Sequence, residues 1–280
     1  MLECQLENAS IKYKSYGEGH PILIMHGGGP NDHLYMQSDL EPLFEKRTGW
    51  QRIYIDQPGH GKTEWPEWIT SPDQILDLLC DFIDQIIPGK RFALAGLSWG
   101  GQLSLGIIDR REEMVEGLFL AVPSVNVEAS KRKVPEHVSL VEDQNFVKEL
   151  QEDEKWITNV LVVQSPAFMG RLRKEIFEVD RKNEKLGCNH KVRMGPYSYD
   201  TRQIFFSKPT LILTGRQDNV VGYRDAWDLV ENFPRATYAV LDRAGHFLSI
   251  EQNTLMKAFV DEWLDRVEES RSKQADSNQR

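Results

Sequence analysis

The chain has 280 residues, of which 40% are hydrophobic and 28% are charged, and its formal net charge at pH 7 is −9. A chain of this length and composition can bury the core of one large α/β domain or two small ones without disulfides, and its acidic balance argues against nucleic acid or an anionic membrane surface as the main partner. The N-terminal segment is too polar for a signal peptide and no apolar run approaches membrane-spanning length, so we expect a cytoplasmic protein.

Short apolar runs separated by helix-like segments recur along the chain. An alternating stretch at residues 9–17 comes first and predicts an antiparallel hairpin at the edge of a sheet. Continuous apolar strands that alternate with helices predict a mostly parallel sheet buried on both faces. In chain order, the runs are PILIMH, RIYID, RFALA, GLFLAV, PTLILTG and TYAVLD.

Residues 124–208 interrupt this rhythm, because they are far too many for an ordinary crossover between strands. The segment is charged and helix-biased, yet it contains Trp156 and Phe177, which a mobile linker would lack. We therefore predict an α/β core formed by residues 1–123 and 209–280, with residues 124–208 inserted as a helical cap. An apolar pocket is expected between cap and sheet edge. Cap residues that could meet a charged substrate group are Glu142, Asp143 and Arg171.

A Gly-x-Ser-x-Gly pattern occupies residues 96–100, between a buried apolar run and a helix-like segment. This strand–turn–helix context is that of a nucleophile elbow. In so tight a turn a side chain at Gly96 or Gly100 would collide with neighbouring backbone, and the strained serine would lift its Oγ clear of the sheet. Ser98 is therefore the candidate nucleophile, and a purely structural turn is the alternative.

A serine hydroxyl at neutral pH needs a base, and the base needs an acid that orients it. His246 follows the last apolar run and should lie at the same sheet edge as Ser98, which makes it the candidate base. Asp218 follows the run PTLILTG and is the candidate acid, with a helix N-cap or turn role as the alternative. Apart from His26, the other histidines are expected at the surface or in turns: His20, His33, His60, His137 and His190.

The first parallel run is followed by "HGGGP", in which three successive glycines allow the backbone to approach a substrate closely. We expect the backbone N–H groups of Gly28 and Trp99 to form an oxyanion hole, the second lying at the start of the helix that Ser98 opens. Gly29 and His26, on either side of this turn, are candidates for substrate contact. A phosphate-cradling role is disfavoured, because the run matches neither common phosphate-binding glycine pattern.

Five stretches in this order, "HGGGP", "DQPGHGKT", "GLSWGG", "TGRQD" and "AGH", resemble those of the α/β-hydrolase superfamily. The resemblance covers nearly the whole chain outside the cap. It implies an eight-stranded, mostly parallel sheet with helices on both faces, in which the N-terminal hairpin supplies the first two strands. It also implies a helical cap after the sixth strand and a Ser98–Asp218–His246 triad.

Within that superfamily the chain resembles carboxylesterases, carbon–carbon bond hydrolases and prolyl aminopeptidases. The tryptophan after Ser98 is similar to that of prolyl aminopeptidases, but these usually carry His-Gly-Gly-Pro-Gly and Asp-Gln-Arg-Gly, whereas this chain has an extra glycine, Gly29, and the stretch Asp56-Gln57-Pro58-Gly59. The resemblance therefore implies a serine hydrolase that cleaves a small-molecule ester or similar carbonyl compound through an acyl-enzyme. Prolyl-type aminopeptidase, carbon–carbon bond hydrolase, and slow-turnover receptor or signalling protein are the alternatives.

The expected chemistry requires no metal and no organic cofactor, since serine, histidine and aspartate suffice for acyl transfer. The three cysteines, Cys4, Cys80 and Cys188, match no metal-binding spacing. We expect a small-molecule substrate as the partner, no nucleic acid and no membrane, and a monomer or homodimer.

Overall fold

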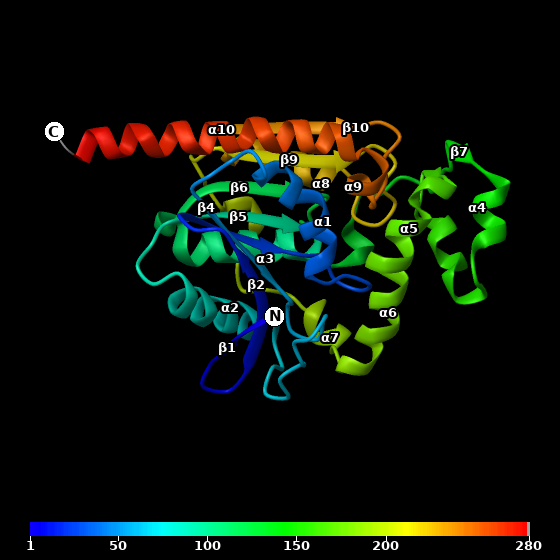
Figure 1. Ribbon diagram of the computed structural model, residues 1–280, viewed down its shortest axis with the longest axis horizontal. Helices are drawn as coiled ribbons and strands as arrows, with labels where there is room; N and C mark the ends of the chain where they lie inside the picture. Colours follow the sequence, from blue (N-terminus) through cyan, green and yellow to red (C-terminus); the bar gives the residue numbers. More distant parts are fainter. Residues whose placement is uncertain (279–280) are drawn as a thin grey trace.

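The centre of the protein is a mostly parallel β-sheet (Figure 1). The computed structural model describes residues 1–278, and the side chains of residues 1–273; residues 279 and 280 of the predicted core lie outside this range. Within residues 1–278 the sheet has eight strands in the order β1-β2-β4-β3-β5-β6-β9-β10. These strands are β1 Leu2–Gln5, β2 Ser10–Tyr16, β3 His20–Met25, β4 Trp50–Ile55, β5 Phe92–Leu97, β6 Val115–Ala121, β9 Thr210–Gly215 and β10 Ala236–Leu241.

The pairing of the strands confirms the predicted α/β-hydrolase fold. β1 pairs antiparallel with β2, and β2 pairs antiparallel with β4, as expected of an N-terminal edge hairpin. The other neighbours, from β4 through β3, β5, β6 and β9 to β10, are all parallel. The carboxyl ends of these parallel strands therefore lie at one edge of the sheet, where loops can bring distant residues together.

The strands β3, β5, β6 and β9 are buried at every residue, which explains why they read as unbroken apolar runs. Neighbouring residues on such a strand face opposite sides of the sheet. In β6, Leu118 and Leu120 join one hydrophobic cluster, whereas Phe119 joins the other. The helices then close both faces, so that two hydrophobic layers sandwich the sheet.

Helices α1 and α10 cover one face of the sheet, and α2 and α3 cover the other (Figure 1). At the start of α2 the Gln74 side chain accepts a hydrogen bond from the Ser71 backbone N–H, as in a capping box. No helix of residues 1–278 is long and apolar enough to cross a membrane. The helices of the core are α1 His33–Phe44, α2 Pro72–Ile86, α3 Trp99–Arg111, α8 Arg224–Trp227, α9 Leu248–Glu251 and α10 Asn253–Asn278, with single 3₁₀ turns at Glu112–Met114 and Val230–Asn232.

The predicted cap, residues 124–208, which we call the cap segment, enters after β6 and returns before β9. It consists of short helices rather than long ones. Figure 1 shows α4, α5 and α6 beyond the end of the sheet toward which the arrows of β5 and β6 point. Its elements are the α-helices α4 Gln144–Glu149, α5 Met169–Leu172, α6 Glu178–Asn183 and α7 His190–Arg193, a π-helical turn at Arg173–Phe177, 3₁₀ turns at Ala129–Lys131, Glu152–Asn159, Pro166–Phe168, Glu184–Leu186 and Thr201–Gln203, and the paired strands β7 Val141–Glu142 and β8 Val163–Gln164.

A partly buried ion pair connects the cap segment to the core. The Arg171 guanidinium lies 2.9 Å from the carboxylate of Asp39 on α1 and 2.8 Å from that of Glu175. Burial raises the pKa of Asp39 to about 6, while the Arg171 charge opposes that shift. Arg171, which the sequence offered as a substrate contact, is therefore already paired with two carboxylates of the protein.

Candidate active site

The turn between β5 and α3 holds Ser98 in a strained conformation. Its φ of 51° and ψ of −110° lie where a non-glycine residue is rarely found. A Cβ added to Gly100 would overlap the carbonyl oxygens of Met25 and His26, and one added to Gly96 would overlap the Gly100 carbonyl. The steric reason for glycine on both sides of Ser98 is therefore confirmed, because Gly100 packs against the end of β3 and Gly96 packs against the Gly100 carbonyl within the turn.

The structure brings Ser98, His246 and Asp218 together at the carboxyl edge of the sheet. His246 Nε2 lies 3.0 Å from Ser98 Oγ, and His246 Nδ1 lies 3.0 Å from Asp218 Oδ2. The three residues follow β5, β10 and β9, respectively. The predicted nucleophile, base and acid are thus connected by two consecutive contacts of hydrogen-bond length, which is the geometry that acyl transfer by a triad requires.

Asp218 is fully buried, and its two carboxylate oxygens contact different groups. Oδ1 accepts hydrogen bonds from the backbone N–H groups of Val220 at 2.8 Å and Val221 at 3.0 Å, while Oδ2 faces His246. The turn role that the sequence left as an alternative is therefore present together with the contact to the histidine. This double attachment holds the carboxylate in one orientation, and the imidazole with it.

The glycine turn after β3 lies beside Ser98, since β3 pairs with β5. Among the described residues, neither the Gly28 N–H nor the Trp99 N–H donates a hydrogen bond to another group of the protein. Both residues line the same cavity as Ser98 and His246. Two unengaged amides beside a serine hydroxyl can stabilise a developing oxyanion, which is the role predicted for them. Gly29, with a φ of 70°, also lines this cavity.

His26 is not brought to the cavity. Its side chain is fully buried, with Nδ1 2.6 Å from the Gly27 carbonyl oxygen and Nε2 accepting a hydrogen bond from the Gln57 backbone N–H at 3.1 Å. Burial lowers the pKa of His26 well below its ordinary value, so the ring is neutral. Nδ1 is engaged within the loop after β3, and Nε2 joins that loop to the loop after β4, so no ring nitrogen is left for a substrate.

The cavity above Ser98 has a volume of about 250 Å³, which suits a small substrate. The cap segment supplies part of its wall, including the aromatic side chain of Trp156, and Phe247 of the core adds a second aromatic side chain. Two arginines, Arg132 and Arg193, also line it, whereas none of the described lining residues is acidic. The lining residues are Gly28, Gly29, Pro30, Asn31, Tyr35, Leu97, Ser98, Trp99, Gln102, Ser124, Arg132, Trp156, Val160, Arg193, Met194, Val220, Val221, His246 and Phe247.

The sequence did not identify the two arginines. It offered Glu142, Asp143 and Arg171 instead, and none of these lines the cavity. Asp143 caps α4 by accepting a hydrogen bond from the Asn145 backbone N–H. Nothing in the residues around Arg193 marks it as inward-facing, because basic residues are frequent throughout the cap segment.

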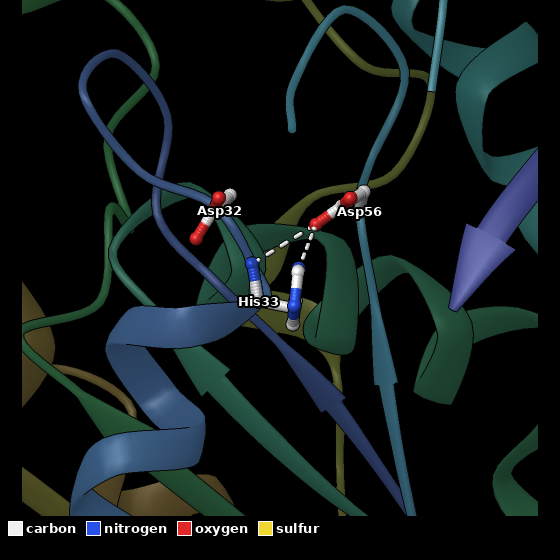
Figure 2. A group of neighbouring side chains, drawn as sticks. All are labelled: Asp32, His33 and Asp56. Atoms are coloured by element: carbon white, nitrogen blue, oxygen red, sulfur yellow. Dashed lines mark hydrogen bonds and ion pairs between the residues drawn. The ribbon is translucent and has the colours of Figure 1, made fainter. Parts of the chain in front are cut away.

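Asp32, His33 and Asp56 form a buried cluster of metal-ligand type in the described part of the chain (Figure 2). Asp56 Oδ1 accepts hydrogen bonds from the His33 backbone N–H at 3.0 Å and lies 2.6 Å from His33 Nδ1, while its Oδ2 accepts from the Lys62 N–H at 2.9 Å. Asp32 caps α1 through the Leu34 N–H. These donors occupy the carboxylates, so the cluster joins the loops after β3 and β4 rather than offering free ligands to an ion.

The prediction that His20 and His33 lie at the surface is wrong. His33 is buried in the cluster just described, and His20 is buried against Glu116, with Nε2 3.1 Å from a carboxylate oxygen. Burial lowers the pKa of His20 to about 3. His20 lies in β3 and His33 in α1, each beside a carboxylate from a distant part of the chain, and sequence context alone did not show that partner.

Glu251 is a further residue that the sequence reasoning missed. Its buried carboxylate accepts hydrogen bonds from the backbone N–H of Gly245 at 2.6 Å, directly before His246. The other oxygen accepts from Val162 at 2.6 Å and Val163 at 3.0 Å in the cap segment. Burial raises the pKa of Glu251 although these three donors oppose the shift. One side chain thus connects the loop of the candidate base to the cap segment.

The chain is similar to a known family and to individual proteins over most of its length. A sequence profile of the family described as "Serine aminopeptidase, S33" matches residues 20–253. The pimeloyl-[acyl-carrier protein] methyl ester esterase of Legionella pneumophila (strain Corby) is 25% identical over 268 residues, which cover 91% of this chain and 99% of that protein. The proline iminopeptidase of Lactiplantibacillus plantarum is 24% identical, covering 87% of this chain and 91% of that protein.

Solved structures show the same architecture. The crystal structure of an α/β superfamily hydrolase from Oenococcus oeni PSU-1 superposes with a TM-score of 0.79 and 26% identity, over 96% of this chain and 100% of that chain. A thermophilic esterase from Thermogutta terrifontis superposes with a TM-score of 0.67 and 20% identity, over 92% and 94% of the two chains, and shares the fold.

Replacing Gly100 by alanine should strongly destabilise the protein, because the new Cβ would overlap two backbone carbonyl oxygens that cannot move aside cheaply. We expect a loss of about 3 kcal/mol or more in the free energy of unfolding, measured by urea denaturation. Gly170→Ala is the control, since no atom lies within 4 Å of its added Cβ. Equal stability of the two variants would contradict the proposed close packing.

Glu251→Gln should lower both stability and turnover, because the amide NH₂ must face a backbone N–H and leave it unpaired. We expect a destabilisation of about 1–3 kcal/mol by thermal or urea unfolding, together with a fall in kcat. The exposed Glu142, changed to Gln, is the matched control. A Glu251→Gln protein with parental stability and kcat would refute the positioning role.

Proposed function

This chain belongs to the serine aminopeptidase (S33) family, whose fold and hydrolase chemistry it shares, and on that premise we propose that it hydrolyses small carboxylic esters through an acyl-enzyme formed on Ser98. The observation that supports this most directly is the 3.0 Å contact between Ser98 Oγ and His246 Nε2 at the floor of a small cavity. The protein is an α/β-hydrolase enzyme; the ester preference and the residue roles are the proposal.

In the proposed reaction, Ser98 Oγ attacks the ester carbonyl carbon while His246 Nε2 takes its proton. The N–H groups of Trp99 and Gly28 stabilise the oxyanion that forms. His246 then gives the proton to the leaving alkoxide, and the acyl group stays on Ser98. Water, deprotonated by His246, releases the acid in the reverse sequence. Asp218 keeps the imidazole in the required orientation throughout. None of these steps needs a metal or an organic cofactor.

The charge of the cavity favours esters over peptides. An aminopeptidase substrate carries a protonated α-amino group beside the scissile bond. Arg132 and Arg193 line the cavity, and no described lining residue is acidic, so such an ammonium group would meet like charges and find no counter-ion. An uncharged or anionic ester meets no such penalty. This supports the activity that the esterase relatives are named for over that of the proline iminopeptidases.

The remaining parts of the proposal concern where and with what the enzyme works. We place it in the cytoplasm, as a monomer or homodimer, acting on a small molecule and not on nucleic acid. The support is the acidic net charge of −9, which repels nucleic acid, and the small volume of the cavity, about 250 Å³.

Ser98→Ala should reduce ester hydrolysis by about 10⁶-fold in kcat, because the variant has no nucleophile. Asp218→Asn should reduce it by about 10⁴-fold, because the amide favours the wrong imidazole tautomer. Both are measured with p-nitrophenyl acetate after the folded state has been verified by circular dichroism. The exposed Ser207, changed to Ala, should keep the parental rate. Parental activity in Ser98→Ala protein would exclude Ser98 as the nucleophile.

Multiple turnover separates an enzyme from a slow receptor of the same fold. With p-nitrophenyl acetate in excess we expect a steady release of nitrophenolate that continues for many equivalents, because water can reach the acyl-enzyme through the cavity. Stopped-flow absorbance measures this release. A receptor would release one equivalent and stop, and that result would refute the proposed function. A parallel panel of short methyl esters, prolyl amides and vinylogous diketones ranks ester, amide and carbon–carbon bond cleavage.

A further inference from the structure

The side chain of Arg193, at the end of α7, is only 8% exposed and lines the cavity that contains Ser98 and His246. No other arginine or lysine among the side chains that the structure describes is buried to this degree. Proteins rarely bury a guanidinium without a carboxylate, because removing its charge from water costs several kcal/mol. The partners of this cation therefore require an explanation.

The Arg193 guanidinium has almost no polar partners in the described part of the chain. Its one hydrogen-bond contact in the described part of the chain joins a terminal nitrogen to His190 Nδ1 at 3.0 Å, and its buried Nε has no partner. No aspartate or glutamate of the described residues forms an ion pair with it. A guanidinium has five N–H donors, so most of those on Arg193 remain available.

Two other arginines have partners in the protein, so the unpaired donors are specific to the position of Arg193. Arg171, also in the cap segment, is paired with Asp39 and Glu175. Arg132 lines the same cavity, but it donates four hydrogen bonds, to the carbonyl oxygens of residues 126, 127 and 220 and to the Ser124 hydroxyl. Arg132 is thus occupied in bracing loops. By this count Arg132 keeps one free N–H group, whereas most of the donors of Arg193 are free at the cavity.

The surroundings of Arg193 place its charge next to the reacting groups. The guanidinium carbon lies 5.2 Å from the centre of the Trp99 ring, the residue that follows Ser98, which is within cation–π distance. Its nitrogen packs against Gly28, so closely that a Cβ at that position would overlap it. Burial, with the Arg193 charge as the next cause, lowers the pKa of nearby His60 to about 3, so that ring is neutral and adds no competing cation.

We propose that Arg193 forms a carboxylate-binding subsite in the active-site cavity, and that the preferred substrates are esters carrying a free carboxylate, such as half-esters of short dicarboxylic acids. The planar guanidinium matches a carboxylate through two parallel N–H···O bonds, and the ion pair would supply the counter-charge that the protein does not. The small cavity keeps this carboxylate within a few bonds of the scissile carbonyl. The inference rests on the proposed ester hydrolysis and names its substrate class.

The test compares anionic esters with neutral esters of the same shape. Monomethyl succinate is paired with methyl levulinate, and monomethyl malonate with methyl acetoacetate, because in each pair a methyl group replaces one carboxylate oxygen. A third pair places the charge in the alcohol part, as O-acetyl glycolate against acetoxyacetone. For the wild-type enzyme we expect kcat/KM to be at least about tenfold higher for the anionic member of one or more pairs.

Arg193→Gln should lower that anionic-to-neutral ratio by about 10²-fold, mainly through KM, because a buried ion pair loses one partner. Lys191→Gln is the matched control, since it removes the same charge from an exposed position on the same helix, and it should leave the ratio unchanged. Arg193→Lys, which keeps the charge but lacks the planar fork, should give an intermediate ratio. It also keeps the test usable if Arg193→Gln does not fold.

The outcomes separate the two proposals. A wild-type enzyme that hydrolyses neutral esters but shows no anionic preference in any pair overturns the carboxylate subsite and leaves ester hydrolysis intact. An enzyme that hydrolyses neither member of any pair overturns the ester proposal itself. Equal losses on both members in Arg193→Gln protein, with an unchanged ratio, would assign Arg193 to oxyanion stabilisation or folding and also overturn the subsite. Only a ratio that falls with Arg193→Gln and not with Lys191→Gln supports it.

Discussion

The close approach of two backbone segments is the constraint on which the site depends. The turn of residues 96–100 packs against the carbonyl groups at the end of β3, which glycine at 100 makes possible, and glycine at 96 lets the turn fold back against the Gly100 carbonyl. The same contact places Ser98 beside the glycine turn that carries Gly28, and it forces Ser98 into a φ of 51°. Strain at the nucleophile and the proximity of the candidate oxyanion hole therefore have one common cause.

Charge is distributed unevenly around this turn. The acid, Asp218, lies behind the imidazole and is held by backbone N–H groups, whereas cations line the cavity in front. The buried histidines that join the loops, such as His26 and His60, have lowered pKa values and are neutral. A substrate thus meets a positive and partly aromatic surface, which disfavours an ammonium group and favours an anion.

The cap segment is attached to the core by charged groups as well as by apolar packing. Arg171 pairs with Asp39 of α1, and Glu251 of α9 accepts hydrogen bonds from the cap backbone and from the residue before His246. A shift of the cap segment would therefore disturb the loop that carries the candidate base. Because Arg193 belongs to the same segment, the proposed carboxylate subsite and the orientation of the imidazole share these attachments.

The sequence by itself determined the sheet, the elbow at Ser98 and the choice of Asp218 and His246, because buried strands and steric turns leave patterns within a few neighbouring residues. It did not determine the burial of His26 or the tie through Glu251, since both depend on partners far away along the chain. Nor could it distinguish Arg193 from Arg171. Both arginines lie in a segment of short helices, and only the packing of that segment on the core decided which guanidinium meets a carboxylate and which faces the cavity.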